Sequence, residues 1–366
     1  MNSTALVYCE GNFGLMDGKT ANGLIRRSHK YNILGVIDST KAGGDSGIYL
    51  DGKTNGIPIY SSLKDAIRIL GSVPDYFIYG MAPASAFLTP PDREIFLAAM
   101  KQGMNIVNPL YELLNEDEEF VKKAKKYHVT IEDVRRTPPR KDLHNFTGRI
   151  LQMNTPVIAV LGTDSAIGKR TTAVLLEQTF LKKGLKPIFI GTGQTGIMQG
   201  AKYSIPLDSI PSQYAIGEIE NVIMTAYEEE HPDLFIIEGQ GSLSSPAYIS
   251  SCIILRGARP AAVILQHAPK RKKLGDFPFM NMPSLESEIQ LIETFSQAKV
   301  VSITLNHESM SEAEIGETIS LYEKNLGLPA SDVLKYGCDK IVACLMEKFP
   351  TLQKALPPQT KKTMKR

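Results

Sequence analysis

Short apolar runs alternate with amphipathic stretches along the first 110 residues of the chain. Four runs are predicted as strands: Ala5–Tyr8, Ile33–Ile37, Tyr76–Tyr79 and Ile106–Val107. The predicted helices between them are Gly18–His29, Ser62–Leu70 and Asp92–Gln102. This alternation predicts a Rossmann-like domain over residues 1–136, with helices on both faces of a parallel sheet. Ligands of such sheets bind at the carboxyl ends of the strands, here the loops Glu10–Gly14, Asp38–Gly47 and Gly80–Ser85.

A second alternating series begins after a charged helical region, Glu112–Arg136, and a linker over residues 137–150. Its predicted strands are Val157–Leu161, Pro187–Ile190, Leu234–Ile237, Ala262–Leu265 and Val300–Leu305. The chain is therefore expected to be an α/β protein with two doubly wound parallel-sheet domains. The second domain is expected to cover residues 151–350 and to be followed by a basic tail, residues 351–366.

The strongest chemical signal is a buried strand that runs through Gly162-Thr-Asp-Ser-Ala-Ile-Gly168 into Lys169 and a helix. Small residues let backbone N–H groups approach an anion, and the start of the helix and the lysine add positive charge. We therefore predict a P-loop NTPase-like domain. The predicted cofactor-binding residues are Gly162, Thr163, Asp164, Ser165, Ala166, Ile167, Gly168, Lys169, Arg170, Thr171 and Thr172.

This loop departs from the Walker pattern at two places. Five residues separate Gly162 from Gly168, where the pattern has four, and Arg170 stands where a hydroxyl residue normally follows the lysine. Thr171 is one residue further, about 100° around the helix. Cleavage of a γ-phosphate needs a hydroxyl in a strict position, whereas static phosphate binding does not.

A carboxylate ends the predicted strand Leu234–Ile237, as in a Walker B strand. Glu238 is a candidate base, or a metal ligand together with Thr171 if the ligand is ATP, and a structural role is the alternative. Two further loops, Gly191–Gly196 and the one that begins at Gln266, are expected to border the same crevice. His267 and Asp164 are further candidate catalytic residues. The predicted substrate-binding residues are Gln194, Thr195, Gln240, Ser242, Ser244, Tyr248 and Arg271.

Composition narrows the function classes. Lys and Arg number 41 against 39 Asp and Glu, a net charge of +2, which is too even for a dedicated nucleic-acid binder. The longest apolar stretches fall far short of the roughly 18 residues that span a bilayer, and the N-terminus does not resemble a leader. Four scattered cysteines indicate no zinc site. We therefore expect a cytoplasmic protein, a homo-oligomer, that binds neither nucleic acid nor membrane.

Several motifs together resemble one two-domain family. They are Lys19-Thr-Ala-x-Gly-Leu, Val36-Ile-Asp-Ser-Thr-x-Ala-Gly, Gly191-Thr-Gly-Gln-Thr-Gly and Glu238-Gly-Gln-Gly-Ser-Leu-Ser-x-Pro-Ala-Tyr. The chain resembles, over nearly its whole length, the formerly uncharacterised family that contains D-glutamate N-acetyltransferase, and its P-loop is similar to that of dethiobiotin synthetase. The chain departs from the family pattern at Arg170 and Ser245.

The resemblance implies acetyl transfer from acetyl-CoA to the amino group of D-glutamate or a related small-molecule amino acid. The P-loop would hold the phosphates of CoA, and Glu238 or Asp164, with His267 behind them, would take the proton. The alternative is an ATP- and Mg²⁺-dependent ligase or kinase, in which Lys169 and Arg170 neutralise phosphates. A nucleotide-binding protein without catalytic activity is the third class. The N-terminal domain lacks a Gly-x-Gly-x-x-Gly fingerprint, so NAD is not expected there.

Overall fold

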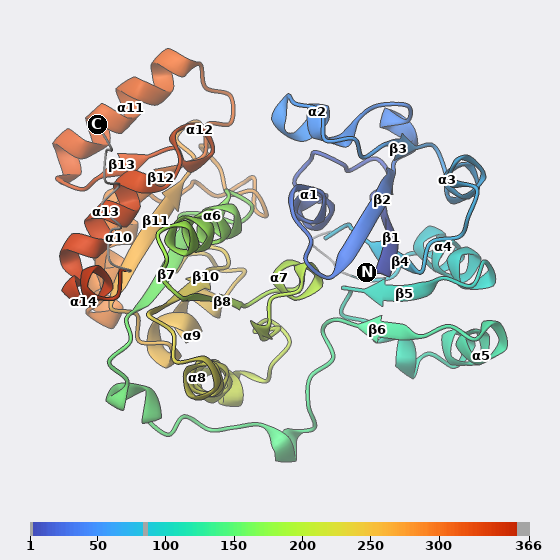
Figure 1. The fold of residues 1–366 in the computed structure, drawn as a ribbon, viewed down its shortest axis with the longest axis horizontal. Helices are drawn as coiled ribbons and strands as arrows, with labels where there is room; N and C mark the ends of the chain where they lie inside the picture. Colours follow the sequence, from blue (N-terminus) through green and yellow to red (C-terminus); the bar gives the residue numbers. More distant parts are fainter. Residues whose placement is uncertain (1–2, 83–86, 357–366) are drawn as a thin grey trace, which may run out of the picture. The chain divides into compact units, whose positions relative to one another are not determined.

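The structure, a computed structural model, describes residues 3–82 and 87–356, and within them it contains two sheets (Figure 1). Both are parallel sheets of an α/β protein, so the predicted fold class is confirmed. Contacts group the chain into two units. The N-terminal unit comprises residues 1–142 and 191–210, and the C-terminal unit comprises residues 143–190 and 211–366.

The N-terminal unit carries six strands in the order β3-β2-β1-β4-β5-β6. This order, 3-2-1-4-5-6, is that of the doubly wound dinucleotide-binding fold. The strands are β1 (Ser3–Tyr8), β2 (Tyr31–Ile37), β3 (Ile59–Tyr60), β4 (Tyr76–Tyr79), β5 (Asn105–Asn108) and β6 (Ile131–Asp133). The helices are α1 (Lys19–Arg26), α2 (Ser46–Asp51), α3 (Leu63–Leu70), α4 (Pro90–Lys101) and α5 (Glu118–Tyr127).

Local chemistry explains where these helices begin. Ser62 caps α3 by accepting from the backbone N–H of Asp65, and Thr89 forms a capping box with Asp92 at the start of α4. Prolines follow Thr89 at the first two positions of α4, where a missing N–H costs nothing. The structure therefore confirms two predicted helices to within two residues at each end, Ser62–Leu70 and Asp92–Gln102. Cores line both faces of the sheet, one against α4 and the other against α1.

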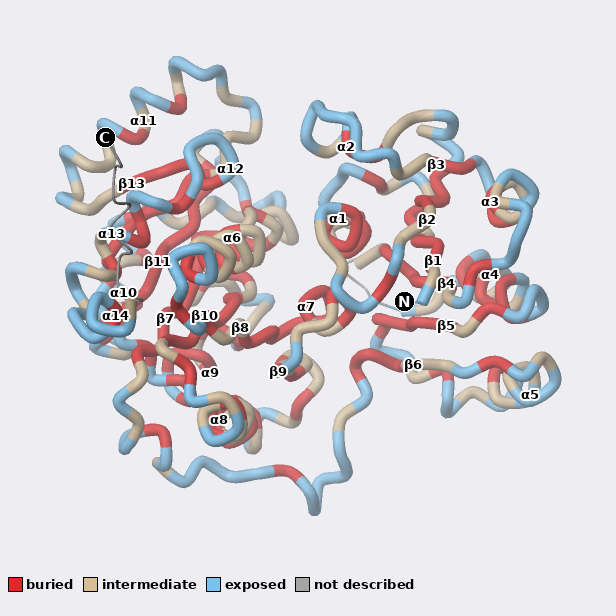
Figure 2. Tube along the Cα trace, in the orientation of Figure 1, coloured by how far each residue is buried: buried red, intermediate tan, exposed pale blue. Residues whose placement is uncertain are grey.

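The second sheet has the order β13-β12-β11-β7-β10-β8-β9. Its strands are β7 (Val157–Gly162), β8 (Pro187–Gly191), β9 (Tyr203–Ser204), β10 (Leu234–Glu238), β11 (Ala262–His267), β12 (Lys299–Leu305) and β13 (Ala330–Ser331). Every residue of β7, β10 and β11 is buried, as Figure 2 shows. Continuous burial is typical of central parallel strands covered on both faces.

Apart from α7, which belongs to the N-terminal unit, the helices of the second half lie around this sheet (Figure 1). They are α6 (Lys169–Lys182), α7 (Gln194–Gln199), α8 (Ser212–Glu230), α9 (Ser250–Gly257), α10 (Leu285–Ser296), α11 (Glu312–Leu326), α12 (Val333–Tyr336), α13 (Asp339–Lys348) and α14 (Pro350–Lys354). One apolar core joins β7 and β10 to α6 and α13, through side chains such as Val160, Phe180, Ile236 and Leu345. It anchors α6, the helix that follows the P-loop.

Three features differ from the sequence predictions. The region Glu112–Arg136 is not helical throughout, because β6 occupies Ile131–Asp133 and pairs with β5. The segment Gly191–Gly196 is not only a loop, since α7 begins at Gln194. The unit boundaries also differ from the predicted domains, because residues 191–210 group with the N-terminal unit. Residues 83–85 of the predicted loop Gly80–Ser85, and 357–366 of the predicted tail, lie outside the described residues.

Candidate P-loop site

Two glycines shape the loop between β7 and α6. Gly168 has φ = 103°, which a side chain rarely tolerates, and it caps the helix that starts at Lys169. A Cβ on Gly162 would lie 2.9 Å from both Ile167 Cδ1 and Lys169 Cδ. Ala166 also has a positive φ, 51°. The sequence Gly-x5-Gly-Lys therefore forms a tight turn in which a side chain at Gly162 would be crowded and one at Gly168 would be strained.

The lysine of this loop is buried. Lys169 is 5% exposed, and its ammonium group donates to the carbonyl oxygen of Asp164, across the turn. Thr172, one turn into α6, donates its hydroxyl to Gln266 Oε1 at 2.6 Å and so ties the helix to β11. Thr304 of β12 donates to the same oxygen at 2.5 Å. Arg170 and Thr171 are partly exposed at the start of the helix.

An ion-pair network fixes the Asp164 carboxylate. Asp164 Oδ2 accepts from Arg271 Nη1 at 2.8 Å and from the backbone N–H of Gly275 at 2.9 Å. Arg271 also donates to the carbonyl of Ser165 and makes two bonds to Glu308. Burial opposes the charge on Arg271, but its bonds to Glu308 and Asp164 prevail and raise the pKa of the guanidinium. The structure therefore places the predicted Arg271 against the P-loop.

Gly275 belongs to a short hairpin after β11 that makes further contacts with the P-loop. Leu274 N–H donates to the carbonyl of Met280 at 3.1 Å, and a bridge joins Lys273 to Asn281. Within the hairpin, Asp276 accepts from the Ser165 hydroxyl at 2.6 Å and from the Tyr248 hydroxyl at 3.0 Å. Tyr248, predicted to bind substrate, therefore shares a partner with the P-loop. Asp276 and Glu308 were missed by sequence reasoning, since nothing local distinguishes them from surface acids.

Glu238 ends β10 beside the P-loop strand. The strands β10 and β7 are neighbours, with Glu238 opposite Val160, and Glu238 is 5% exposed. The next residue, Gly239, donates its N–H to the Val160 carbonyl at 2.9 Å. A Cβ on Gly241 would lie 2.5 Å from the Tyr248 ring, so this position needs glycine. The Gly-Gln-Gly run thus brings the following loop against the end of the sheet.

A second buried carboxylate, Glu288 of α10, holds that loop. Glu288 is fully buried and accepts from the Leu243 N–H at 2.5 Å and from the Ser244 hydroxyl at 2.7 Å. Burial raises the pKa of its carboxyl group, and these bonds and the charge of Lys169 lower it in part. Ser242 lies within 3.3 Å of Ser244, oxygen to oxygen. Sequence reasoning missed Glu288, because it stands in an amphipathic helix among exposed acids.

His267, at the end of β11, is also part of this group. Its Nδ1 lies 2.8 Å from the Thr163 hydroxyl, and burial lowers its pKa to about 4, with Glu286 opposing the shift weakly. The imidazole is therefore neutral at pH 7. Gln240 lies in the same loop as Ser242, and its carbonyl accepts from the Ser251 hydroxyl at 3.0 Å.

The predicted residues Gln194 and Thr195 lie on α7, in the N-terminal unit. The Thr195 hydroxyl lies 3.0 Å from that of Thr20 on α1, and both residues are buried. Their predicted part in substrate binding stays a prediction. Among residues 3–82 and 87–356, no cluster of three or more His, Cys, Asp or Glu side chains could hold a metal ion.

The domain pair matches a known family. Residues 39–137 match "Domain of unknown function (DUF1611_N) Rossmann-like domain", and residues 144–342 match "Domain of unknown function (DUF1611_C) P-loop domain". The chain belongs to the DUF1611 family. Both predicted domain types are therefore confirmed, as is the family resemblance seen in the sequence motifs.

Two named relatives and one solved structure are similar to this chain. A protein from Pseudoalteromonas sp named D-glutamate N-acetyltransferase is 30% identical over 275 residues, 74% of this chain and 80% of the relative. A protein of the same name from Tritonibacter scottomollicae is 28% identical over 274 residues, covering 73% and 80%. The crystal structure of a DUF1611 family protein from Anabaena variabilis is 27% identical, with a TM-score of 0.87 over 94% of this chain and 100% of that one.

The relatives' shared name favours an enzyme. In the part of the chain that the structure describes, no helix is long and apolar enough to cross a membrane.

Proposed function

We propose that this DUF1611 protein transfers an acetyl group from acetyl-CoA to the amino group of D-glutamate or a related amino acid. The observation that carries the proposal is the joint presence of relatives named for this reaction and a loop suited to a polyanion. We expect the protein to work in the cytoplasm.

The loop fits the phosphates of CoA. The left-handed conformation at position 168 favours glycine, and the space beside Gly162 is too small for a Cβ. Without side chains at these two positions, backbone N–H groups can approach an anion closely. Lys169 is buried at the start of α6, where its charge adds to the positive end of the helix dipole. The proposed reaction requires this loop to bind phosphate groups and not to cleave them. Arg170 in place of the usual hydroxyl residue is therefore compatible with the proposal.

The reaction joins the substrate nitrogen to the thioester carbon and breaks the bond from that carbon to sulfur. The substrate ammonium must first lose a proton, and the departing thiolate gains one. We assign the proton acceptor to Glu238, which ends β10 next to the P-loop strand. The Asp164 carboxylate already accepts from Arg271 and Gly275, so its role is to position the loop. A histidine with a pKa of about 4 is a weak base at pH 7, so we propose His267 as the proton acceptor only after Glu238.

Glu238→Gln tests this assignment. The substitution keeps the size and shape of the side chain, so we expect the melting temperature to change little and kcat to fall by about 10²–10⁴-fold. Thiol release from acetyl-CoA with D-glutamate measures the rate. Undiminished turnover would make Glu238 structural.

One observation favours the alternative, an ATP- and Mg²⁺-dependent ligase or kinase. An acidic residue ends the strand beside the P-loop strand, where a Walker B carboxylate stands, and Thr171 lies near the start of α6. Measurements with and without EDTA separate the two. Thiol release that persists in EDTA supports the acyltransferase, whereas ATP consumption that EDTA abolishes supports the ligase or kinase.

A further inference from the structure

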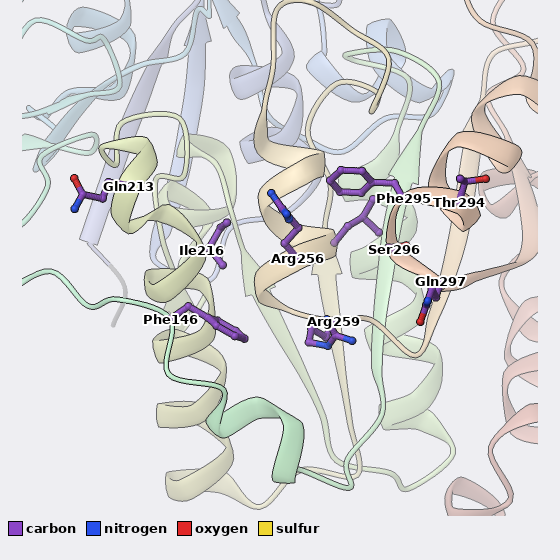
Figure 3. Close-up of a pocket in the computed structure, with 10 residues that line it drawn as sticks. Phe146, Gln213, Ile216, Arg256, Arg259, Thr294, Phe295, Ser296 and Gln297 are labelled. Atoms are coloured by element: carbon purple, nitrogen blue, oxygen red, sulfur yellow. The ribbon is translucent and has the colours of Figure 1, made fainter.

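A cavity that opens to solvent lies at the surface of the C-terminal unit, away from the P-loop. Its volume is about 740 Å³, in the range of small-molecule pockets, and its lining comes from α8, α9, α10 and the segment before β7 (Figure 3). Apolar side chains form part of the lining, among them Phe146, Ile216 and Phe295. Two arginines, Arg256 and Arg259, also line it. The sequence motifs and the proposed reaction use none of these residues.

The cavity and the P-loop lie at opposite edges of the same sheet. Arg259 precedes β11 and Gln297 precedes β12, so the cavity borders the amino ends of these strands. His267, at the carboxyl end of β11, contacts the P-loop residue Thr163. Six residues of strand separate the two edges by about 20 Å. A ligand in this cavity is therefore a second ligand and not an extension of the first.

Close packing builds the walls. A Cβ on Gly257 of α9 would lie 2.2 Å from Ile219 Cγ2 and 2.6 Å from the Ile216 carbonyl of α8, so the two helices touch at a glycine. The contact fixes the direction of α9, whose last turn carries Arg256. The close packing of α8 against α9 thus fixes the backbone from which Ile216 and Arg256 project.

The segment that carries Phe146, at the rim of the cavity, is held in place by packing and hydrogen bonds to α8. A Cβ on Gly217 would lie 2.6 Å from the Phe146 backbone nitrogen, so the segment crosses directly over α8. On either side, Glu218 accepts from His144 and Glu220 accepts from the Thr147 N–H at 2.6 Å. Both carboxylates are buried.

Both arginines are exposed where the cavity opens to solvent, and no carboxylate among the described residues pairs with them. Within residues 3–82 and 87–356, neither Arg256 nor Arg259 forms an ion pair, and the Arg256 guanidinium lies 5.6 Å from the centre of the Phe295 ring. Arg259 has φ = 42°, the left-handed conformation in which helices commonly end, and it lies directly after the C-cap of α9. Two guanidinium groups in one cavity suit a carboxylate or a phosphate, which they bind through paired hydrogen bonds.

We propose that this cavity binds a small organic anion. Its carboxylate or phosphate contacts Arg256 and Arg259, and its apolar part lies against Phe146, Ile216 and Phe295. The carboxamide of Gln297 borders the same space and adds a hydrogen-bonding group.

Titration of the full-length protein by ligand-observed NMR tests the proposal, with phenyl phosphate and 3-phenylpropanoate as probes. We expect Arg256→Gln and Arg259→Gln each to weaken binding of the preferred probe about tenfold, and the double variant to abolish it. Arg68→Gln, which removes an exposed arginine of α3, is the matched control and should leave binding unchanged. The preferred probe tells whether the site favours phosphate or carboxylate.

Phe146→Ala separates the apolar wall from the charges. It should weaken phenyl phosphate more than inorganic phosphate, because only the former has an apolar body. Circular dichroism melting of each variant confirms that it is folded. The proposal is overturned if folded double variant and wild type bind both probes equally, or if Lys169→Ala removes the binding that the double variant retains, which would place the probes in the P-loop. Neither result depends on the acetyltransferase activity.

Discussion

At the scale of single residues, the proposed function makes Lys169 the side chain on which cofactor binding should depend most. It is the buried cation of the P-loop, and its ammonium group reaches across the turn to the Asp164 carbonyl. We expect Lys169→Ala to weaken acetyl-CoA binding about 100-fold or more, because a charge-assisted hydrogen bond to phosphate is lost. Isothermal titration calorimetry measures the affinity, and Lys182→Ala, at the other end of α6, is the control. Unchanged affinity for both acetyl-CoA and ATP would rule out the phosphate-loop assignment.

His267 makes stability depend on pH in a predictable direction. Burial lowers its pKa to about 4, against about 6.5 in the unfolded chain, so the unfolded state binds the proton more readily. Its contribution is complete above pH 6.5 and is lost as the pH falls toward 4, by up to about 1.4 kcal/mol per pH unit. His267→Asn should remove this part of the slope of unfolding free energy against pH, measured by urea denaturation. His128→Asn, which removes an exposed imidazole, is the control, and an equal slope in all three proteins would contradict the prediction.

At the scale of elements, two glycines in helices should behave in opposite ways. In α8, a Cβ at Gly217 would lie 2.2 Å from the His144 carbonyl, whereas at Gly316 in α11 no atom lies within 4 Å. Gly217→Ala should destabilise the protein by about 1–3 kcal/mol, because backbone must move. Gly316→Ala should stabilise it by about 0.5–1 kcal/mol through helix propensity. Thermal melting of both variants gives the comparison. Equal shifts of the melting temperature would show that the segment over α8 can move away from Gly217 at little cost in free energy.

At the scale of the whole molecule, the two units are not the two halves of the sequence. Met198 lies on α7, between two strands of the second sheet in sequence, yet it is fully buried in a core with α1 and β1. Met198→Ala should therefore cost about 2–5 kcal/mol of N-terminal stability.

Hydrogen exchange locates that loss. For Met198→Ala we expect faster exchange in α1 and β1, and for Met224→Ala of α8, the matched control, faster exchange in the C-terminal unit. Faster exchange of both units in both variants would mean that they unfold as one.

The sequence alone determined the α/β class, the family and the location of the P-loop. The predicted strands and helices rest on local signals, such as the apolar run Val157–Leu161 and the prolines that begin α4, which need no distant partner. The shortest elements, such as β3, escaped prediction because two residues carry no periodicity and form a strand only by pairing with β2.

Only the tertiary structure decided which polar residues meet. Glu288 lies 44 residues from its partner Ser244, Asp276 lies 111 residues from Ser165, and Glu308 lies 37 residues from Arg271. Contacts over such separations leave no local pattern in the sequence. The same holds for α7, a short segment whose sequence gives no helical pattern. It is held in place because Met198 packs in the same core as Ala5, far away in the sequence. Local chemistry fixes secondary structure and the glycine-dependent turn of the P-loop, whereas burial and ion pairing depend on which strands lie side by side.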